Sequence, residues 1–193
     1  MSGTVNMLVD ISGHKPVGSF SAKAMEEQAA LYQFTDRLFR AESLGDVFDA
    51  ALDAIGRALG CQRASILLFD HTGTMKFAAW RGLSDGYRQA VEGHAPWAPD
   101  TRGAQPIGVE DIESANMPKA LKAIVKAEGI GALAFVPLVA KGQLVGKFMT
   151  YYDARHVFHD SEVDLAVAIA RQLGFSVERM RAEDARRRAE EEL

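Results

Sequence analysis

The alternation of apolar and polar residues predicts a helix near each end of the chain. In 22–41, Leu31, Phe34 and Leu38 recur at intervals of three and four residues and would share one helix face. A longer helix is expected from about Ser161 to near the C-terminus. Apolar residues there alternate in steps of four and three, a pattern typical of two helices packed along a seam. These residues are Ala166, Ala170, Leu173, Val177 and Met180.

A further helix is expected directly after the first. Ser43 is a good N-cap, and Asp46 three residues later completes an acidic variant of the capping box. The helix is expected to end at Gly60, because glycine readily takes the positive φ of a helix terminus.

Five apolar runs between these helices predict strands. Residues 64–70 are apolar at successive positions, which indicates a strand covered on both faces. Together with 75–80 they would form a hairpin. A brief strand is expected at 107–109, and 132–139 with 144–152 would form a second hairpin.

The remaining segments complete the order of elements. Residues 84–92 fit a short helix, and 117–128 fit another that begins near Pro118 and ends before Gly129. Residues 93–105 hold two prolines and two glycines and are expected to form a loop. Helices and hairpins in this order favour an antiparallel sheet with helices on both faces, an α+β fold.

Composition narrows the class of protein. Of 193 residues, 48% are hydrophobic and 25% are charged, the balance of a soluble globular protein. A net charge of −4 and the lack of a long basic patch argue against nucleic-acid binding. No apolar run reaches the roughly 18 residues that cross a bilayer, so no membrane insertion is expected. The single cysteine, Cys61, excludes an internal disulfide and favours a cytoplasmic protein.

The chain is expected to hold one folded domain between two less ordered ends. Residues 1–20 mix Gly, Ser and Pro with a short apolar patch and are expected to form a flexible leader. Residues 21–180 carry the predicted helices and strands. Beyond Met180 the seam positions become charged, so 181–193 are predicted to begin a signalling or coiled-coil linker helix.

Five short segments, in order along some 150 residues, resemble the GAF family of sensory domains. The clearest is a strand that ends in Pro137-Leu138, followed by a turn with Gly142 and a strand with an inner glycine, Gly146. The segments are 59–66, 109–112, 129–138, 142–146 and 158–162. Pro137 and the two glycines also suit ordinary structural positions at a strand end, in a turn and at a close approach.

The resemblance implies a GAF/PAS-like central antiparallel sheet of five to six strands with a long C-terminal helix. The first, second and last helices would cover one face, and the small helix, the loop and the 117–128 helix the other. A small ligand would bind on this second side, although the same side chains would equally fill the space as a second core. The residues implied in ligand binding are Tyr87, His94, Trp97, Asp111, Ile112, Leu121 and Phe135.

Several ligands known in the family are not expected here. Bilin-binding members often attach the pigment through a cysteine near the small helix, where this chain has Tyr87 and His94. His94 is interpreted as a solvated loop histidine, so neither bilin nor haem is expected. Members that reduce methionine sulfoxide use several cysteines. The cyclic-nucleotide pattern is matched at Phe158, but no Asn-Lys pair precedes it and Glu162 stands four residues later, so this ligand is disfavoured but stays an open alternative. No histidine spacing suits zinc.

No catalytic constellation stands out, so the domain is not expected to be an enzyme by itself. Glu110 and Asp111 are adjacent and would face opposite sides of a strand. Two functions remain open. One is a sensory domain that binds a small molecule and transmits a signal through its terminal helices to an output domain such as a histidine kinase. The other is a ligand-free dimerisation and spacer module.

The terminal helices are expected to hold a parallel homodimer, because the last helix is longer than a domain of this size requires. The first helix is expected to join the same bundle. The residues assigned to the interface are Leu31, Phe34, Leu38, Ala166, Ala170, Leu173, Val177 and Met180.

Overall fold

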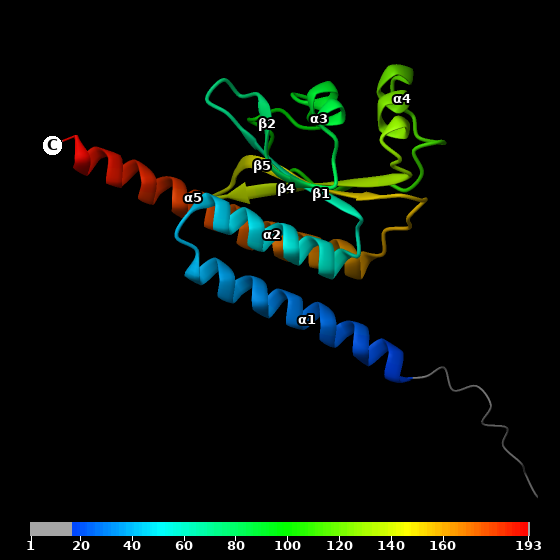
Figure 1. Ribbon diagram of the computed structural model, residues 1–193, viewed down its shortest axis with the longest axis horizontal. Helices are drawn as coiled ribbons and strands as arrows, with labels where there is room; N and C mark the ends of the chain where they lie inside the picture. Colours follow the sequence, from blue (N-terminus) through cyan, green and yellow to red (C-terminus); the bar gives the residue numbers. More distant parts are fainter. Residues whose placement is uncertain (1–16, 193) are drawn as a thin grey trace, which may run out of the picture.

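A five-stranded antiparallel sheet organises the described part of the chain, residues 17–192 of the computed structural model (Figure 1). The strands are β1 (Arg63–Phe69), β2 (Met75–Arg81), β3 (Ile107–Val109), β4 (Ala132–Ala140) and β5 (Gln143–Tyr152). They lie in the order β2-β1-β5-β4-β3, and all neighbours are antiparallel. The predicted α+β fold with two hairpins is confirmed.

Helices cover both faces of this sheet (Figure 1). They are α1 (Val17–Arg40), α2 (Leu44–Leu59), α3 (Asp85–Val91), α4 (Lys119–Ala127) and α5 (Asp160–Glu191). α2 and α5 pack on one face, and α3 and α4 lie on the other. α1 lies on the same side of the sheet as α2 and α5, as the resemblance implied, but it packs mainly on α2 and so forms an outer layer.

The start and end of α2 follow from its sequence. The Ser43 hydroxyl accepts a hydrogen bond from the backbone N–H of Asp46, and the Asp46 carboxylate accepts one from the backbone N–H of Ser43 at 3.0 Å. This is the predicted capping box. Gly60 closes the helix with a φ of 60°, in the left-handed region that glycine tolerates.

A glycine also permits the central strand pairing. Gly146 in β5 lies against β1, and a Cβ atom on it would sit 2.1 Å from the carbonyl oxygen of Leu67. No side chain fits there, so Gly146 allows the close backbone approach that its place in the strand suggested.

The sheet separates two apolar cores. The larger core lies between the sheet and α2 and α5, and it includes Ile66 of β1 and Phe148 of β5. The smaller core lies between the sheet and α3 and α4, and it includes Leu67 and Met149. Consecutive residues of β1 therefore enter different cores, which confirms that this strand is covered on both faces.

One boundary differs from the expectation. α1 begins at Val17, inside the stretch 1–20 that was expected to be a flexible leader. The rest of that leader, 1–16, lies outside the described residues, as does Leu193 at the end of the proposed linker segment.

Candidate functional site

Two small cavities lie on opposite faces of the sheet. Each has a volume of about 70 Å³, room for a few water-sized groups. The cavity beside the first turns of α5 is called the α5 cavity. The cavity beneath α3 and α4 is called the α3/α4 cavity.

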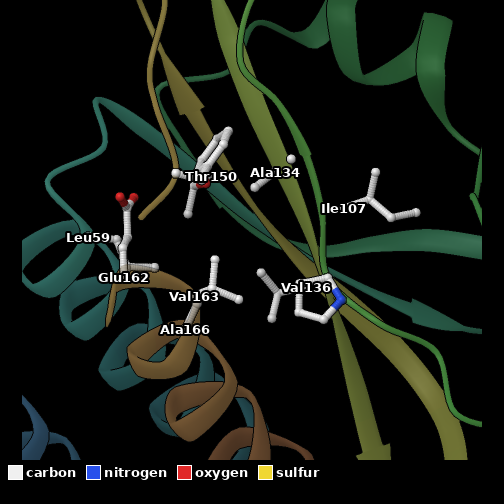
Figure 2. A pocket seen from close by; sticks show the side chains of 11 residues that line it. Leu59, Ile107, Ala134, Val136, Thr150, Glu162, Val163 and Ala166 are labelled. Atoms are coloured by element: carbon white, nitrogen blue, oxygen red, sulfur yellow. The ribbon is translucent and has the colours of Figure 1, made fainter. Parts of the chain in front are cut away.

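The α5 cavity is apolar and opens beside a hydrogen-bonded cluster. Figure 2 shows Val163 and Ala166 of α5 opposite Ala134 and Val136 of β4, with Glu162 at the edge. The residues that line it are Leu59, Pro106, Ile107, Gly108, Ala134, Val136, Thr150, Phe158, Glu162, Val163 and Ala166.

The Glu162 carboxylate already has hydrogen-bond partners among neighbouring side chains. The Tyr152 hydroxyl donates to Glu162 Oε1 at 2.8 Å, and His156 Nε2 lies 2.8 Å from the same oxygen. The His156 ring stacks on Tyr152 with centroids 3.8 Å apart. Burial, and then the Glu162 carboxylate, raise the pKa of Tyr152 well above its usual range, so the phenol stays protonated and able to donate. The cluster fastens the start of α5 to the end of β5.

The α3/α4 cavity is built from side chains of six helices and strands and of two loop residues, His94 and Met117. β1 and β2 form part of its floor, β4 and β5 the rest, and α3 and α4 cover it. The lining residues are Leu67, Phe77, Tyr87, Val91, His94, Met117, Leu121, Val125, Leu133, Phe135, Lys147 and Met149.

Four of the residues implied by the family resemblance meet at this cavity. Tyr87, Leu121 and Phe135 contribute side chains from α3, α4 and β4. Burial raises the pKa of Tyr87 to about 12, so its phenol remains neutral and its ring serves as an apolar wall. His94 also borders the cavity, but the residue is exposed and its Nδ1 lies 3.1 Å from the Val91 carbonyl oxygen.

Three implied residues lie elsewhere. Trp97 is half-buried in the loop after α3 and does not line the cavity. The Asp111 carboxylate accepts hydrogen bonds from the backbone N–H of Glu113 and the hydroxyl of Ser114, so it stabilises a turn. Ile112 is only 1% exposed and belongs to the smaller core, again away from the cavity lining.

Lys147 is the lysine of the cavity lining, and the sequence analysis did not identify it as a site residue. It lies in β5 between Gly146 and Phe148 and is only 2% exposed. Its Nζ donates to the His94 carbonyl oxygen at 3.0 Å and lies 4.9 Å from the centroid of the Phe135 ring. A charged residue inside an apolar strand buried on both faces was the available signal, because lysine is almost never fully buried without a reason.

The residues assigned to a dimer seam lie instead inside one chain, which corrects that interface. Leu31 is half-buried, and the other seven are buried in the larger core, where α1, α2 and α5 pack together. The spacing identified a helix–helix seam correctly, but the partner helices belong to the same chain. The seven residues are Phe34, Leu38, Ala166, Ala170, Leu173, Val177 and Met180.

A different face of α1 and α5 carries exposed aromatic residues, and it is called the α1/α5 face. On α1, Tyr32 and Phe39 are seven residues apart, and Phe39 is 87% exposed. On α5, Phe175 is 67% exposed. It lies between Gln172, which accepts a hydrogen bond from Thr35 of α1, and Arg179, whose guanidinium donates to the Leu38 carbonyl. Phe175 therefore stands along the line where the two helices meet.

Other kinds of chemistry find little support among residues 17–192. No group of three or more His, Cys, Asp or Glu side chains there is arranged to hold a metal ion. Burial raises the pKa of the Cys61 thiol to about 11, which makes it a poor nucleophile at neutral pH. In the same range, no helix is both long and apolar enough to cross a membrane.

The structure has an antiparallel sheet with α1, α2 and α5 on one side, and α3 and α4 over a small cavity on the other. This is the architecture that the resemblance implied, and comparison with known proteins agrees. A family model described as GAF domain matches residues 41–178. The chain belongs to the GAF domain family. None of the curated proteins compared with the chain matches it.

Solved structures supply relatives at several distances. A domain of a protein described as a two-component sensor histidine kinase from Sinorhizobium meliloti 1021 shares 55% identity, covers 76% of this chain and 99% of that chain, and has a TM-score of 0.72. The GAF domain of a phosphoenolpyruvate-protein phosphotransferase from Coxiella burnetii shares 20% identity, with 84% and 98% coverage and a TM-score of 0.65. A phycoerythrobilin-bound GAF domain from a cyanobacterial phytochrome shares 13%, with 81% and 96% coverage and a TM-score of 0.62. The last two share the fold alone.

Proposed function

We propose that this GAF domain is a sensory module that binds a small molecule in the α3/α4 cavity. The observation that carries the proposal is the cavity itself, where side chains from β1, β2, α3, α4, β4 and β5 converge around unfilled space. A mainly apolar hollow with a few convergent polar groups is the usual form of a small-molecule site. The present volume of about 70 Å³ suits a ligand of a few heavy atoms.

The route from the cavity to the terminal helices runs through β5. Lys147 and Met149 face the cavity, whereas Phe148 between them is buried in the larger core with α2 and α5. A ligand that displaces β5 by a fraction of an ångström would therefore also shift Phe148 against α2 and α5.

The output is proposed to lie in a linked domain. The likeness to a domain of a sensor histidine kinase supports a kinase as the regulated partner. α5 runs past the sheet as an exposed helix after Met180, and Figure 1 shows this projection. We propose that it transmits the signal, with a second copy of the domain alongside.

Cavity-filling variants test the location of the ligand. Val125→Phe would fill the α3/α4 cavity, and the same substitution at Val163 would fill the α5 cavity. Native mass spectrometry of protein purified from a cell extract should show a carried-over small molecule in the wild type and in Val163→Phe, and none in Val125→Phe. Circular dichroism confirms that each variant folds.

Other outcomes of this experiment have definite meanings. Ligand retained in Val125→Phe and lost in Val163→Phe would move the site to the α5 cavity. A wild-type protein that carries no ligand, and gains no thermal stability from a metabolite extract, would favour the ligand-free dimerisation and spacer module.

A further inference from the structure

Lys147 presents a cation to the α3/α4 cavity from the middle of the sheet. Side chains alternate along β5, so Lys147 shares the α3/α4 face with Met149 and Tyr151. The residue is 2% exposed, and its side chain forms part of the cavity lining beside Phe135. Its ammonium group is therefore withdrawn from bulk solvent and available to whatever enters the cavity.

This ammonium has no counter-ion within the described part of the chain. An ammonium carries three N–H donors, and Lys147 directs one of them to the His94 carbonyl oxygen. The Phe135 ring offers a weak cation–π contact at 4.9 Å. No Asp or Glu of residues 17–192 pairs with Nζ, and desolvation is the sole cause that shifts its pKa, downward to about 8.

An unpaired buried charge is costly, so its presence at a cavity calls for a ligand. Buried ions in proteins are normally paired, and an unpaired one destabilises the fold by several kcal/mol on the order-of-magnitude scale of desolvation penalties. Groups held in this condition concentrate at functional sites. An anion that enters the cavity would supply the missing partner and two hydrogen-bond acceptors.

We propose that Lys147 anchors an anionic ligand in the α3/α4 cavity, a small monocarboxylate with a short apolar body. The inference rests on the proposed function and specifies the ligand class of that site. The carboxylate would accept hydrogen bonds from Nζ, and the apolar body would lie against Phe77, Leu121 and Phe135. A single ammonium balances one negative charge, whereas a phosphate dianion would call for a second Lys or Arg, and Lys147 is the one such side chain among the described lining residues.

The test uses matched acids and amides. Propanoate and butanoate are titrated against propanamide and butanamide, which have the same shape without the charge. Methyl NMR of Met117 and Met149, both in the cavity lining, reports occupancy. The proteins are the wild type, Lys147→Met, and Lys76→Met as a control at an exposed lysine that pairs with Glu92.

The acids are expected to perturb both methionine methyls in the wild type and in Lys76→Met. Lys147→Met should weaken acid binding by about tenfold to a hundredfold, the usual scale of a charge-assisted hydrogen bond, while leaving amide binding nearly unchanged. Bound acid should also raise the pKa of Lys147, as read from its Cε chemical shift, because an opposite charge favours the ammonium form.

Two results would overturn the inference in distinguishable ways. Amides that bind as well as acids, or acids that bind Lys147→Met undiminished, would refute the anionic anchor while leaving the α3/α4 cavity as the ligand site. If neither series shifts the methyls at concentrations up to about 10 mM, both the anchor and the proposed small-molecule site are contradicted.

Discussion

Lys147 makes the stability of the domain depend on pH. Its pKa falls from the ordinary 10.5 to about 8 because burial disfavours the ammonium form. Below pH 8 the folded and unfolded chains both carry the proton, and the folded state bears the whole desolvation cost. Between about pH 8 and 10.5 the unfolded chain binds more protons, so the free energy of unfolding rises with pH across that window.

Lys147→Met should therefore stabilise the domain at neutral pH. We expect a gain of about 1–3 kcal/mol near pH 7, because the substitution replaces a desolvated cation by an apolar chain of similar length. The gain should shrink as pH approaches about 10. Urea unfolding at a series of pH values measures it, with Lys76→Met as the control that should show no such trend. A pH-independent difference between wild type and Lys147→Met would contradict the assignment.

The chemistry of Cys61 should be equally sensitive to its surroundings. Burial raises its thiol pKa from 9.0 to about 11. At pH 8 the thiolate fraction is then about a hundredfold lower than in the unfolded chain, and attack on a disulfide depends on the thiolate. Reaction with a chromogenic disulfide should be slower by about this factor in the native protein than in urea. Equal rates in the two conditions would show that the thiol is not desolvated.

Among single residues, the sequence predicted a residue's role correctly where its contacts lie within a few positions along the chain. Ser43 and Asp46 predicted a cap because both partners lie within one helical turn. Tyr87 and Phe135 were placed on the right side of the sheet through their elements. Trp97 and Lys147 were misplaced or missed, because the direction of a loop and the burial of one strand residue depend on contacts far along the chain.

At the scale of elements, β5 contributes to the cores on both faces of the sheet. It pairs with β1 and β4, and alternate side chains enter the two cores. The pairing with β1 requires Gly146, whose missing side chain leaves room for the Leu67 carbonyl. The strand is therefore expected to tolerate change poorly, in contrast to helical positions with open space around them.

Two glycine-to-alanine substitutions test this contrast. Gly146→Ala places a methyl group 2.1 Å from the Leu67 carbonyl oxygen and should destabilise the domain by about 2–4 kcal/mol. Gly56→Ala lies in α2 with no atom within 4 Å of the added carbon, and it should stabilise by up to about 1 kcal/mol. Thermal unfolding of both variants measures the two effects. Similar destabilisation in both would mean that the β1–β5 approach is not the constraint.

The sequence predicted where helices and strands begin and end better than it predicted which of them pack together. The strand 107–109 and the two hairpins were predicted correctly, because alternation and turn residues define them locally. The steps of three and four in the last helix also predicted a packed seam correctly. The sequence could not say whether the facing helix belongs to the same chain, since an apolar stripe on a helix packs equally well against either.

At the scale of the whole molecule, the apolar seam of α5 is buried inside one chain. The homodimer is therefore proposed to form through the α1/α5 face instead. Leu173 and Val177 are fully buried in one chain and have no surface left to offer a partner. Tyr32, Phe39 and Phe175 are exposed and lie on adjoining helices. Large aromatic side chains spaced by seven residues on an outer helix suit the core of a helix–helix interface.

Substitutions on this face should separate association from folding. Tyr32→Glu combined with Phe39→Glu should convert a dimer into a folded monomer, because two charges would replace the apolar centre of the interface. Val157→Glu, at an exposed apolar residue in the loop before α5 rather than on α1 or α5 themselves, should leave the dimer intact. Leu173→Glu combined with Val177→Glu should unfold the domain instead, because both positions are buried in the larger core.

Light scattering gives the mass of each variant, and circular dichroism gives its folded fraction. The dimer proposal requires an intact chain that is dimeric at micromolar concentration and a Tyr32→Glu, Phe39→Glu variant that is monomeric and folded. A parallel arrangement would bring the two α5 helices out on the same side, where each projects beyond the sheet (Figure 1). A spin label on an exposed α5 residue, Ala185 or Ala189, would then report short distances between copies. Long distances in a confirmed dimer would indicate antiparallel packing, which is incompatible with transmission through a shared helix pair.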